Sequence, residues 1–366
     1  MKIICSGLDL SDAVSKVAKA CATRSTNPIL ECIKLVASGG TLKLIATDLE
    51  LGIERSIKAS TPIEGETVVP GALFGSFVSR LKYEQVELTL MDNVLRVKYG
   101  DSEVKFVTMS ATDFPSIAQV NLDQSFSMSP KDLRDLVSKV VFAVGHDDSR
   151  PLLKGVLIEV GDNIATAVAL DGYRLAKCRR EVSSSTGTMK AIVPARSLNE
   201  IARALSDGDK TATIYIQKSY LLLDLGHTKI TTRLLEGDYV DYNRIIPSSF
   251  ETTTVIPVAP FADGLVRATL LAKSDSISMV KFDIKDNSLL MSSTSAVGNL
   301  NERLVVKTNG NDIAIAFNAS FFGQILGGID TDTVTLKFTG PTLPCIITPT
   351  STSDDLLYLL LPVRLM

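Results

Sequence analysis

The sequence predicts an α+β protein built from three copies of one domain, each with two helices packed on antiparallel sheets. A 14-residue stretch occurs three times, and predicted strands and helices follow the same order around each occurrence. The length of 366 residues suits two or three domains. Solenoid units run to only about 20–50 residues, so a repeat this long indicates whole domains.

The recurrent stretch combines the end of a strand with an amphipathic helix. Pro70, Pro194 and Asn318 occupy equivalent places, 124 residues apart. Apolar residues then follow at i, i+3, i+4 and i+7, the spacing of one helix face. The three copies read VVPGALFGSFVSRL at 68–81, IVPARSLNEIARAL at 192–205 and AFNASFFGQILGGI at 316–329. The first core residues that they predict are Phe74, Leu198 and Phe322.

Each copy opens with a strand and a helix, continues with alternating strands and the recurrent stretch, and closes with a β-hairpin pattern. The six predicted helices are 11–24, 72–82, 131–140, 195–205, 261–273 and 319–328. The strands that follow the first helix of each copy are predicted at 31–38, 155–160 and 278–284. Polar segments at 121–128 and 248–255 read as linkers. The predicted domains are therefore 1–121, 128–247 and 254–366.

Motifs of catalysis are missing from the sequence. It has no phosphate-binding loop, dinucleotide fingerprint, HExxH or GxSxG. The two histidines, His146 and His227, lie in polar turns without a local partner for a general base. Asp48 and Asp171 hold related places in the first two copies, which favours a shared turn-forming role. We expect no catalytic residues.

Cofactor, metal and membrane signals are also missing. The five cysteines show no CxxC spacing and are expected to be reduced core residues. No cofactor and no metal are expected. The N-terminus, MKIICSGLDLSD, turns polar too early for a signal peptide, and no apolar run approaches a membrane span. We expect a cytoplasmic protein with no membrane partner.

The net charge of −3 conceals an uneven distribution. The predicted helices hold twelve Lys and Arg against five Asp and Glu. This excess reflects either ordinary solvated helix surfaces or a helical side that faces a polyanion. Without interleaved aromatic and basic residues, a duplex held through its phosphates fits better than a stacked single strand. On the outer face of the recurrent helix, the first two copies carry Arg80, Lys82, Arg196 and Arg203, whereas the third is uncharged there.

Five motifs, in order and over the full length, connect the chain to a known family. They are ATDLELGIERS (46–56), TDFPSI (112–117), LDGYRLAK (170–177), GDYVDYNRIIP (237–247) and YLLLPVRLM (358–366). The chain resembles the bacterial β sliding clamps, the processivity subunits of replicative DNA polymerases. The resemblance implies three DNA-clamp folds per chain and two chains closed head to tail into a ring. Such a ring slides on duplex DNA without reading its sequence and has no catalytic activity of its own.

The resemblance also implies three sets of site residues. With the basic helix residues above, the expected DNA-binding set is Arg24, Arg80, Lys82, Arg150, Arg196 and Arg203. The expected peptide-binding cleft comprises Leu153, Leu170, Gly172, Tyr173, Arg174, Leu175, Val240, Arg244, Ile245, Pro344, Leu360, Leu361, Pro362, Val363 and Arg364. The expected dimer interface includes strand 103–109 with Phe106, and Leu270 and Leu271.

The implied partners are double-stranded DNA, a second copy of the chain, the polymerase catalytic subunit and the clamp loader. Other polymerases and repair proteins that carry clamp-binding peptides complete the set. The chain departs from the family at Tyr173, where many clamps have histidine, and at Leu170, where threonine is usual. It also has Arg150-Pro151-Leu152 where some clamps carry tyrosines, and it has Met366 beyond the usual end.

Two other classes of protein compete with the clamp. One is a peptide-binding scaffold of three clamp-like domains that does not bind DNA. The other is an enzyme that uses only carboxylates and arginines. From the residues alone, Leu170, Leu175 and Leu361 also suit plain core packing.

Overall fold

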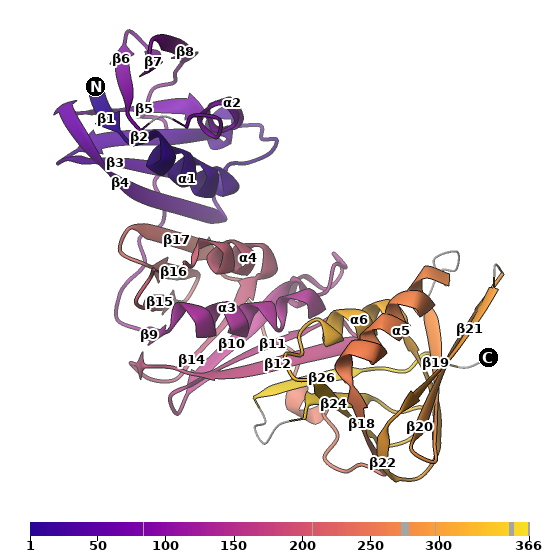
Figure 1. The fold of residues 1–366 in the computed structure, drawn as a ribbon. Helices are drawn as coiled ribbons and strands as arrows, with labels where there is room; N and C mark the ends of the chain where they lie inside the picture. Colours follow the sequence, from indigo (N-terminus) through magenta and orange to yellow (C-terminus); the bar gives the residue numbers. More distant parts are fainter. Residues whose placement is uncertain (83, 207, 272–277, 297, 351–354, 365–366) are drawn as a thin grey trace. The chain divides into compact units, whose positions relative to one another are not determined.

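The computed structural model describes residues 1–82, 84–206, 208–271, 278–296, 298–350 and 355–364 (Figure 1). The chain divides into two compact units, and each is described separately. The first unit comprises residues 1–131, 182–189 and 196–234. The second comprises residues 132–181, 190–195 and 235–366, of which 272–277, 297, 351–354 and 365–366 lie outside the described residues.

The first repeat lies wholly in the first unit. Its helix α1 packs on β3 and β4, and α2 packs on β2 and β5 beside it (Figure 1). Its elements are β1 Lys2–Cys5, α1 Gly7–Val17, η1 Ala18–Ala20, η2 Pro28–Glu31, β2 Cys32–Ser38, β3 Thr41–Thr47, β4 Leu51–Ile63, β5 Gly65–Pro70, α2 Gly71–Val78, β6 Val86–Met91, β7 Val94–Tyr99 and β8 Ser102–Val107.

The second repeat contributes elements to both units. Its elements are β9 Ser125–Met128, α3 Pro130–Ser138, η3 Val141–Ala143, η4 Pro151–Lys154, β10 Gly155–Gly161, β11 Ile164–Leu170, β12 Arg174–Glu181, β13 Ser184–Ser185, β14 Met189–Pro194, α4 Ala195–Ala204, β15 Ala212–Gln217, β16 Tyr220–Asp224, β17 Thr228–Arg233 and η5 Tyr242–Arg244.

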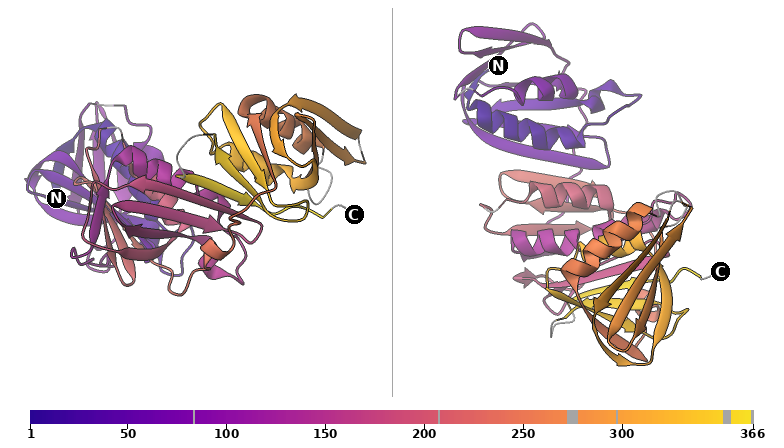
Figure 2. Two further views of the ribbon diagram at one scale, coloured as in Figure 1. Left: turned by 90° about the horizontal axis from the view of Figure 1, so that it is seen from below. Right: turned by 45° about the vertical axis from the view of Figure 1, so that its right-hand side comes forward.

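The third repeat lies in the second unit, where α5 and α6 pack side by side (Figures 1 and 2). Four phenylalanines fill its core, with neighbouring ring centres 5.2–5.5 Å apart. Its elements are β18 Thr252–Pro257, α5 Val258–Leu271, β19 Met279–Lys285, β20 Ser288–Ser295, β21 Gly298–Val305, β22 Lys307–Gly310, β23 Ile313–Asn318, α6 Ala319–Leu326, β24 Thr333–Phe338, β25 Cys345–Pro349 and β26 Leu356–Leu360.

The recurrent stretch forms the same strand-to-helix turn three times, as predicted. Pro70 ends β5, Pro194 ends β14 and Asn318 ends β23, and a helix begins at the next residue each time. Pro70 and Asn318 are N-cap residues with extended backbone, and the Asn318 side chain accepts bonds from two helix N–H groups. The predicted core residues Phe74, Leu198 and Phe322 are fully buried.

The tight turn after the strand that follows the first helix, β2, β10 or β19, confirms the threefold repeat. Gly39-Gly40, Asp162-Asn163 and Asp286-Asn287 occupy equivalent positions, and all six residues have positive φ. Two successive left-handed residues match the twist of a β-hairpin, and Gly, Asn and Asp tolerate them best. The same local chemistry therefore forms the same turn in each repeat.

Two pairs of strands make the sheets continuous from one repeat to the next. In the first unit β4 pairs with β17 from Arg55↔Thr228 to Leu51↔Thr232. In the second unit β12 pairs with β26 from Arg174↔Leu360 to Cys178↔Leu356. These pairings attach the two parts of the second repeat to different neighbours, which explains why three repeats form two compact units.

The predicted linkers are wrong at two strands. Residues 125–128 form β9 and residues 252–255 belong to β18. Both segments are polar in composition, but burial alternates along them as in a strand with one buried face. Thr252 and Thr254 are buried, and their hydroxyls hydrogen-bond the Asn311 carbonyl and Thr308. All six predicted helices are present, but their ends differ from the prediction. Helix α1 runs from Gly7 only to Val17 and α2 ends at Val78, so Arg24, Arg80 and Lys82 lie beyond the helices that were expected to carry them. Helix α5 begins at Val258, and Lys273 lies outside the described residues.

The cysteines are all free, and four of the five are buried. Burial raises the pKa of the Cys5 and Cys21 thiols to about 12. Within the described ranges, no three His, Cys, Asp or Glu side chains gather as a metal site would need. No helix among these residues is both long and apolar enough to span a membrane.

Candidate functional sites

The expected peptide-binding residues gather in the second unit, where β12 of the second repeat meets β26 of the third. Leu153, Leu170 and Leu175 lie in one buried cluster with Tyr239 and Tyr242. These leucines are therefore core residues, and Leu153 also lines the pocket described next. Leu361 differs, because it is exposed.

A pocket of about 550 Å³ lies beside this buried cluster. Its lining includes five of the predicted site residues, which are Arg150, Leu153, Gly172, Tyr173 and Arg174. Arg150 was expected among the DNA-binding residues, and in the structure it lines this pocket. Sequence reasoning missed the other lining residues, which are Gly145, His146, Asp147, Asp171 and Phe321.

Arg174 supports the pocket from below. Only 6% of its surface is exposed, so it is not a rim arginine as expected. Its Nε donates to Asp171 Oδ2 at 3.0 Å and its Nη2 donates to the Phe142 carbonyl at 2.8 Å. Its Nη1 donates to Gln324, and its guanidinium lies over the Phe321 ring, 4.3 Å from the centre. Burial lowers the Arg174 pKa, and Asp171 opposes that shift.

Asp171 and Asp48 form the same turn in the first two repeats, as predicted. Asp171 Oδ1 accepts from the backbone N–H groups of Tyr173 and Arg174 at 2.9 and 3.0 Å. Asp48 Oδ1 accepts from those of Glu50 and Leu51 at 3.1 and 2.8 Å. A carboxylate that bonds its own chain two and three residues on stabilises a tight turn.

The exposed rim of the cleft comes from three segments of the chain. The segment after β26 lies against its neighbours through two backbone bonds, from Leu361 N to the Tyr173 carbonyl at 2.9 Å and from Val363 N to the Ala316 carbonyl at 2.8 Å. Leu360 is buried, whereas Pro344, Pro362 and Val363 are half-buried, and Met366 lies outside the described residues. The exposed rim residues are Tyr173, Val240, Arg244, Ile245, Leu361 and Arg364.

Two tyrosines fix the segment that carries Val240, Arg244 and Ile245. Tyr239 Oη donates to the Gly155 carbonyl at 3.3 Å, and Tyr242 Oη donates to Glu159 at 2.9 Å. Burial raises the pKa of each phenol to about 12. The motif GDYVDYNRIIP contains both residues, so its two tyrosines were the sequence signal that this segment is anchored to the core.

The basic residues predicted on the helices differ in exposure and pairing. Arg24, Arg80, Lys82 and Arg203 are exposed, as a phosphate-binding surface requires. Arg196 is exposed but ion-paired, with Nη1 2.5 Å from Asp48 Oδ2. Lys139 of the predicted third helix is buried, with Nζ 2.5 Å from Asp330 Oδ2. Lys139 therefore adds nothing to an exposed basic surface.

The expected dimer-interface residues lie on β8 in the first unit and on α5, which packs beside β21, in the second. Strand β8 ends the large sheet of the first unit, and β21 ends the four-stranded sheet of the third repeat. Phe106 of β8 points inward, is 4% exposed and packs on Phe74 and Phe77. The next residue, Val107, is 77% exposed.

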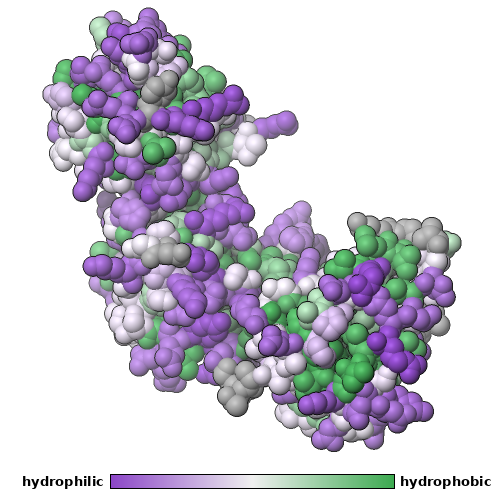
Figure 3. Space-filling model, in the orientation of Figure 1, coloured by the Kyte–Doolittle hydropathy of each residue, from purple (hydrophilic) through white to green (hydrophobic). Residues whose placement is uncertain are grey.

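The third repeat exposes an apolar surface near its free edge. Hydrophobic residues gather over α5 in the space-filling view (Figure 3). Val266 and Leu270 are exposed on α5, and Leu271 is half-buried. Val305 at the end of β21 is 84% exposed. Large apolar side chains beside the edge strand of a sheet are typical of a protein interface.

Family models match the chain in three consecutive segments. They are the N-terminal domain of the DNA polymerase III beta subunit at residues 1–118, its central domain at 127–241 and its C-terminal domain at 243–364. Three such domains in one chain define a DNA-clamp protein. The chain belongs to the DNA polymerase III beta subunit family, the bacterial β sliding clamps.

Individual relatives agree over nearly the whole length. The beta sliding clamp of Staphylococcus epidermidis is 29% identical over 357 residues, which is 94% of each chain. The crystal structure of the Bacillus subtilis DNA polymerase sliding clamp has a TM-score of 0.96 at 26% identity, with both chains fully covered. A putative DNA polymerase III beta subunit from Eubacterium rectale has a TM-score of 0.94 at 30% identity, also with full coverage.

Proposed function

We propose that two copies of this chain close head to tail into a ring around duplex DNA and hold the replicative polymerase on it. The observation that carries the proposal is the run of three clamp-domain matches, in family order, over residues 1–364. A closed ring turns repeated rebinding of the polymerase into an intramolecular event at high effective concentration. The DNA-free scaffold has no observation in its favour.

Ring closure is assigned to β8 of one copy and β21 with α5 of the other. Both strands end their sheets, and each exposes a valine, Val107 on β8 and Val305 on β21. Strand β21 also packs beside α5, which exposes Val266 and Leu270. Pairing two such edges across copies satisfies their backbone hydrogen-bonding groups and covers the exposed apolar side chains. Phe106 supports the assignment from within, because it fixes β8 on the core of the first repeat.

Duplex DNA is assigned to the exposed basic residues of the helices and their loops. Contacts to phosphates position a protein on DNA without reading bases, and salt weakens them. Such contacts suit a protein that must slide. The proposed residues are Arg24, Arg80, Lys82, Arg196 and Arg203, with Arg150 shared with the cleft.

Partner proteins are assigned to the cleft between β12 and β26. A short extended peptide with apolar anchors would lie across Leu153 and Tyr173, with Arg244 and Arg364 at the edge. The replicative polymerase, the clamp loader and other polymerases and repair proteins would compete for this one surface. The proposed domains that carry these surfaces are 1–121, 128–247 and 254–366.

The test is topological. The protein is loaded on nicked circular DNA by a clamp loader, and retention is followed by gel filtration before and after the circle is cut. We expect retention on the circle and loss after linearisation. Equal behaviour on circular and linear DNA, or no retention on either, would rule out the clamp. Sliding clamps are processivity factors, so we also propose that the chain catalyses no reaction itself.

A further inference from the structure

The two joints between successive repeats contain strand ladders of the same length. The first joint comprises β4 and β17 with α1, η1 and α4, and the second comprises β12 and β26 with α3, η3 and α6. Each ladder has five residue pairs. A difference in stiffness between the joints must therefore come from the helices and side chains that pack on the ladders.

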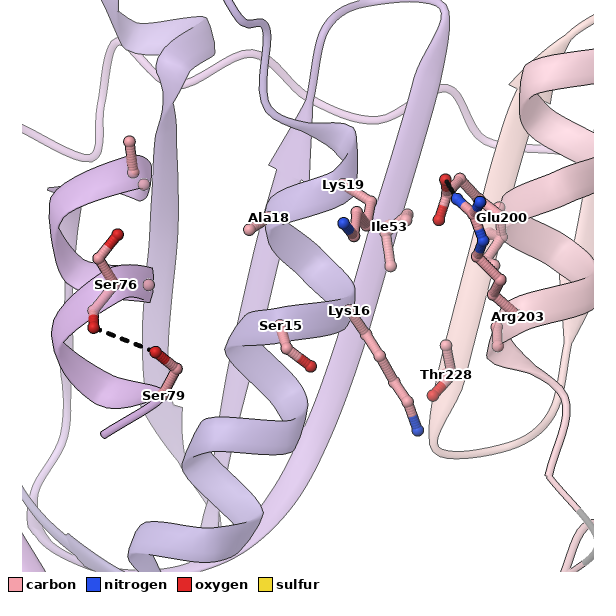
Figure 4. A pocket seen from close by; sticks show the side chains of 15 residues that line it. Ser15, Lys16, Ala18, Lys19, Ile53, Ser76, Ser79, Glu200, Arg203 and Thr228 are labelled. Carbon is pink, nitrogen blue, oxygen red and sulfur yellow. Dashed lines mark hydrogen bonds and ion pairs between the residues drawn. The ribbon is translucent and has the colours of Figure 1, made fainter. Parts of the chain in front are cut away.

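The first joint is hollow on its helical side. A pocket of about 570 Å³ extends along α1 toward α2 and toward α4 (Figure 4). Ile53 and Ile230, the middle pair of the ladder, line it from the sheet. Lys19 of η1 lines the pocket opposite Glu200 and Arg203 of α4 (Figure 4). Space is therefore left between the two repeats on this side.

Two aromatic rings occupy the same place in the second joint. Tyr358 belongs to the middle pair of its ladder, as Ile230 does, and Phe142 is the middle residue of η3, as Lys19 is of η1. Tyr358 is fully buried, and its ring centre lies 5.7 Å from that of Phe142. Gly328 has no side chain at the point where Tyr358 Oη packs against it. The second joint is therefore filled.

Two equivalent lysines also have different partners. Lys16 lies three residues before Lys19, and Lys139 lies three residues before Phe142. Lys16 Nζ pairs with Asp12 of its own helix at 3.2 Å. Lys139 is buried, and its Nζ lies 2.5 Å from Asp330 Oδ2 in the third repeat. Only the second of these ion pairs connects one repeat to the next.

The facing helices show the same contrast. Glu200 of α4 and Gln324 of α6 occupy equivalent positions, 124 residues apart. Glu200 pairs with Arg203 of its own helix, at 2.6 Å between Oε1 and Nη1. Gln324 instead accepts a hydrogen bond from Arg174 of the second repeat. Equivalent side chains thus stay within one repeat at the first joint and connect two repeats at the second.

The contacts that do cross the first joint lie toward the ends of its ladder. Arg55 of β4 donates to Thr228 of β17 at 2.7 Å, within the end pair. Arg196 of α4 pairs with Asp48, which precedes β4, and donates to the Lys19 carbonyl at 3.2 Å. About half of the Arg196 side chain is exposed, at 53%, so water can replace either acceptor.

We propose that the first joint is the bending joint of the chain, where α4 moves against α1, and that the second joint is rigid. Close-packed side chains resist compression, so Phe142 and Tyr358 stop α6 from closing on α3. Separation of these helices would leave the buried Lys139 ammonium unpaired, which is costly. In the first joint the pocket leaves room for closure, and the exposed Arg196 contacts permit separation.

This inference goes beyond the proposed function, because it concerns motion within one chain. In a ring of two chains, a change of curvature would be taken up at the first joint of each copy. The proposal does not require the ring, and its test does not depend on DNA.

The experiment measures distances across both joints of the full-length protein by double electron–electron resonance. Spin labels are attached at Leu8→Cys with Asn199→Cys across the first joint, and at the equivalent Lys131→Cys with Gly323→Cys across the second. Cys21→Ser removes the native cysteine that is not buried. Excess unlabelled chain keeps the labels of two copies apart. The first pair should give the broader distance distribution.

A filling variant tests the cause. Lys19→Phe with Ile230→Tyr places the two rings of the second joint at the equivalent positions of the first. It should narrow the first distribution to the width of the second. A variant that folds, by circular dichroism, but keeps the wild-type width would overturn the proposal.

A matched pair of lysine variants covers the case in which the filling variant does not fold. Lys139→Met removes the ion pair across the second joint without leaving a buried charge, and it should broaden the second distribution. Lys16→Met is the control and should leave the first distribution unchanged, because Lys16 pairs within α1. Equal widths for the two joints of the wild type, or no broadening by Lys139→Met, would overturn the proposal.

Discussion

The guanidinium of Arg174 lies between the rings of Phe142 and Phe321, 5.3 and 4.3 Å from their centres. It joins the first residue of β12 in the second repeat to α6 of the third through Gln324. The wall of the cleft pocket, formed by Tyr173 and Phe321, therefore depends on a side chain that a bound peptide would scarcely touch.

Replacing Arg174 with alanine should reduce both stability and peptide binding. The change leaves the largely buried Asp171 carboxylate without its partner, at a cost of about 3 kcal/mol in the free energy of unfolding. Denaturant unfolding and titration with a polymerase peptide measure the two effects. Arg364→Ala is the control, because Arg364 is exposed. It should weaken the peptide alone, and equal stability losses in both variants would contradict this role for Arg174.

Introducing glutamate at Val107 or Val305 should give monomers. Each change places a charge on an exposed edge residue of β8 or β21, where closure would desolvate it. Sedimentation equilibrium gives the oligomeric state, and Leu270→Ala with Leu271→Ala should shift it the same way. Met91→Glu, at an exposed residue of β6, is the control and should remain dimeric. Persistent dimers in both valine variants would exclude these edges from the interface.

Deleting residues 362–366 should abolish binding of the polymerase peptide and leave the dimer intact. The deletion removes Val363, whose N–H bonds the Ala316 carbonyl, and the exposed Arg364 at the rim. Neither lies on β8 or β21. Peptide titration and sedimentation on the same sample report the two properties, and retained peptide affinity would refute the cleft assignment.

Replacing Arg24 and Arg196 with glutamate should lower loading or retention on nicked circular DNA. Arg24→Glu gives the simpler result, since Arg196 also pairs with Asp48 and its reversal would place two carboxylates together. Retention is compared across a salt series, where loss of phosphate contacts flattens the dependence. A profile identical to the wild type at every salt concentration would remove Arg24 from the DNA surface.

Stability should fall as the pH rises from about 10 to about 12, partly through Tyr239. Burial raises the pKa of this phenol from 10.0 in the unfolded chain to about 12 in the folded protein. Between these values the unfolded state releases a proton that the folded state keeps, so higher pH favours unfolding. The full contribution is present below pH 10. Each pH unit in this window removes up to about 1.4 kcal/mol for this group.

The substitution Tyr239→Phe tests this origin. It removes the titrating hydroxyl and keeps the ring in its buried cluster. The variant should lose less stability than the wild type between pH 10 and pH 12 in denaturant unfolding. Parallel curves for the two proteins would show that Tyr239 does not titrate as the burial of its hydroxyl requires.

The threefold architecture was predictable because its signals are local. The turn before each recurrent helix depends on Pro70, Pro194 and Asn318, and the stripe behind it depends on residues within two helical turns. Strands β9 and β18 were missed because the contacts that stabilise them are distant in the sequence. Thr252 and Thr254 satisfy their hydroxyls through Asn311 and Thr308, nearly sixty residues away, and composition carries no trace of those contacts.

The sites show the same division. Tyr173, Arg244 and Arg364 are exposed, as the polar segments around them predict. The burial of Arg174 instead depends on its contact with Gln324, which is 150 positions distant. Lys19 and Arg203 line one pocket of the first unit only because β4 pairs with β17. The sequence gives the charges of such a pocket, but tertiary pairing decides which charges become neighbours.

The continuous sheets of the two units have a mechanical consequence. Every joint between successive repeats consists of a covalent connection and a ladder of backbone hydrogen bonds, β4 with β17 or β12 with β26. Joints of this kind bend or stretch, but they do not come apart without unfolding. In a ring of two such chains, only the interfaces between the two copies can dissociate while both chains stay folded. A clamp loader that strains the ring would therefore open it between β8 and β21, and DNA would enter there.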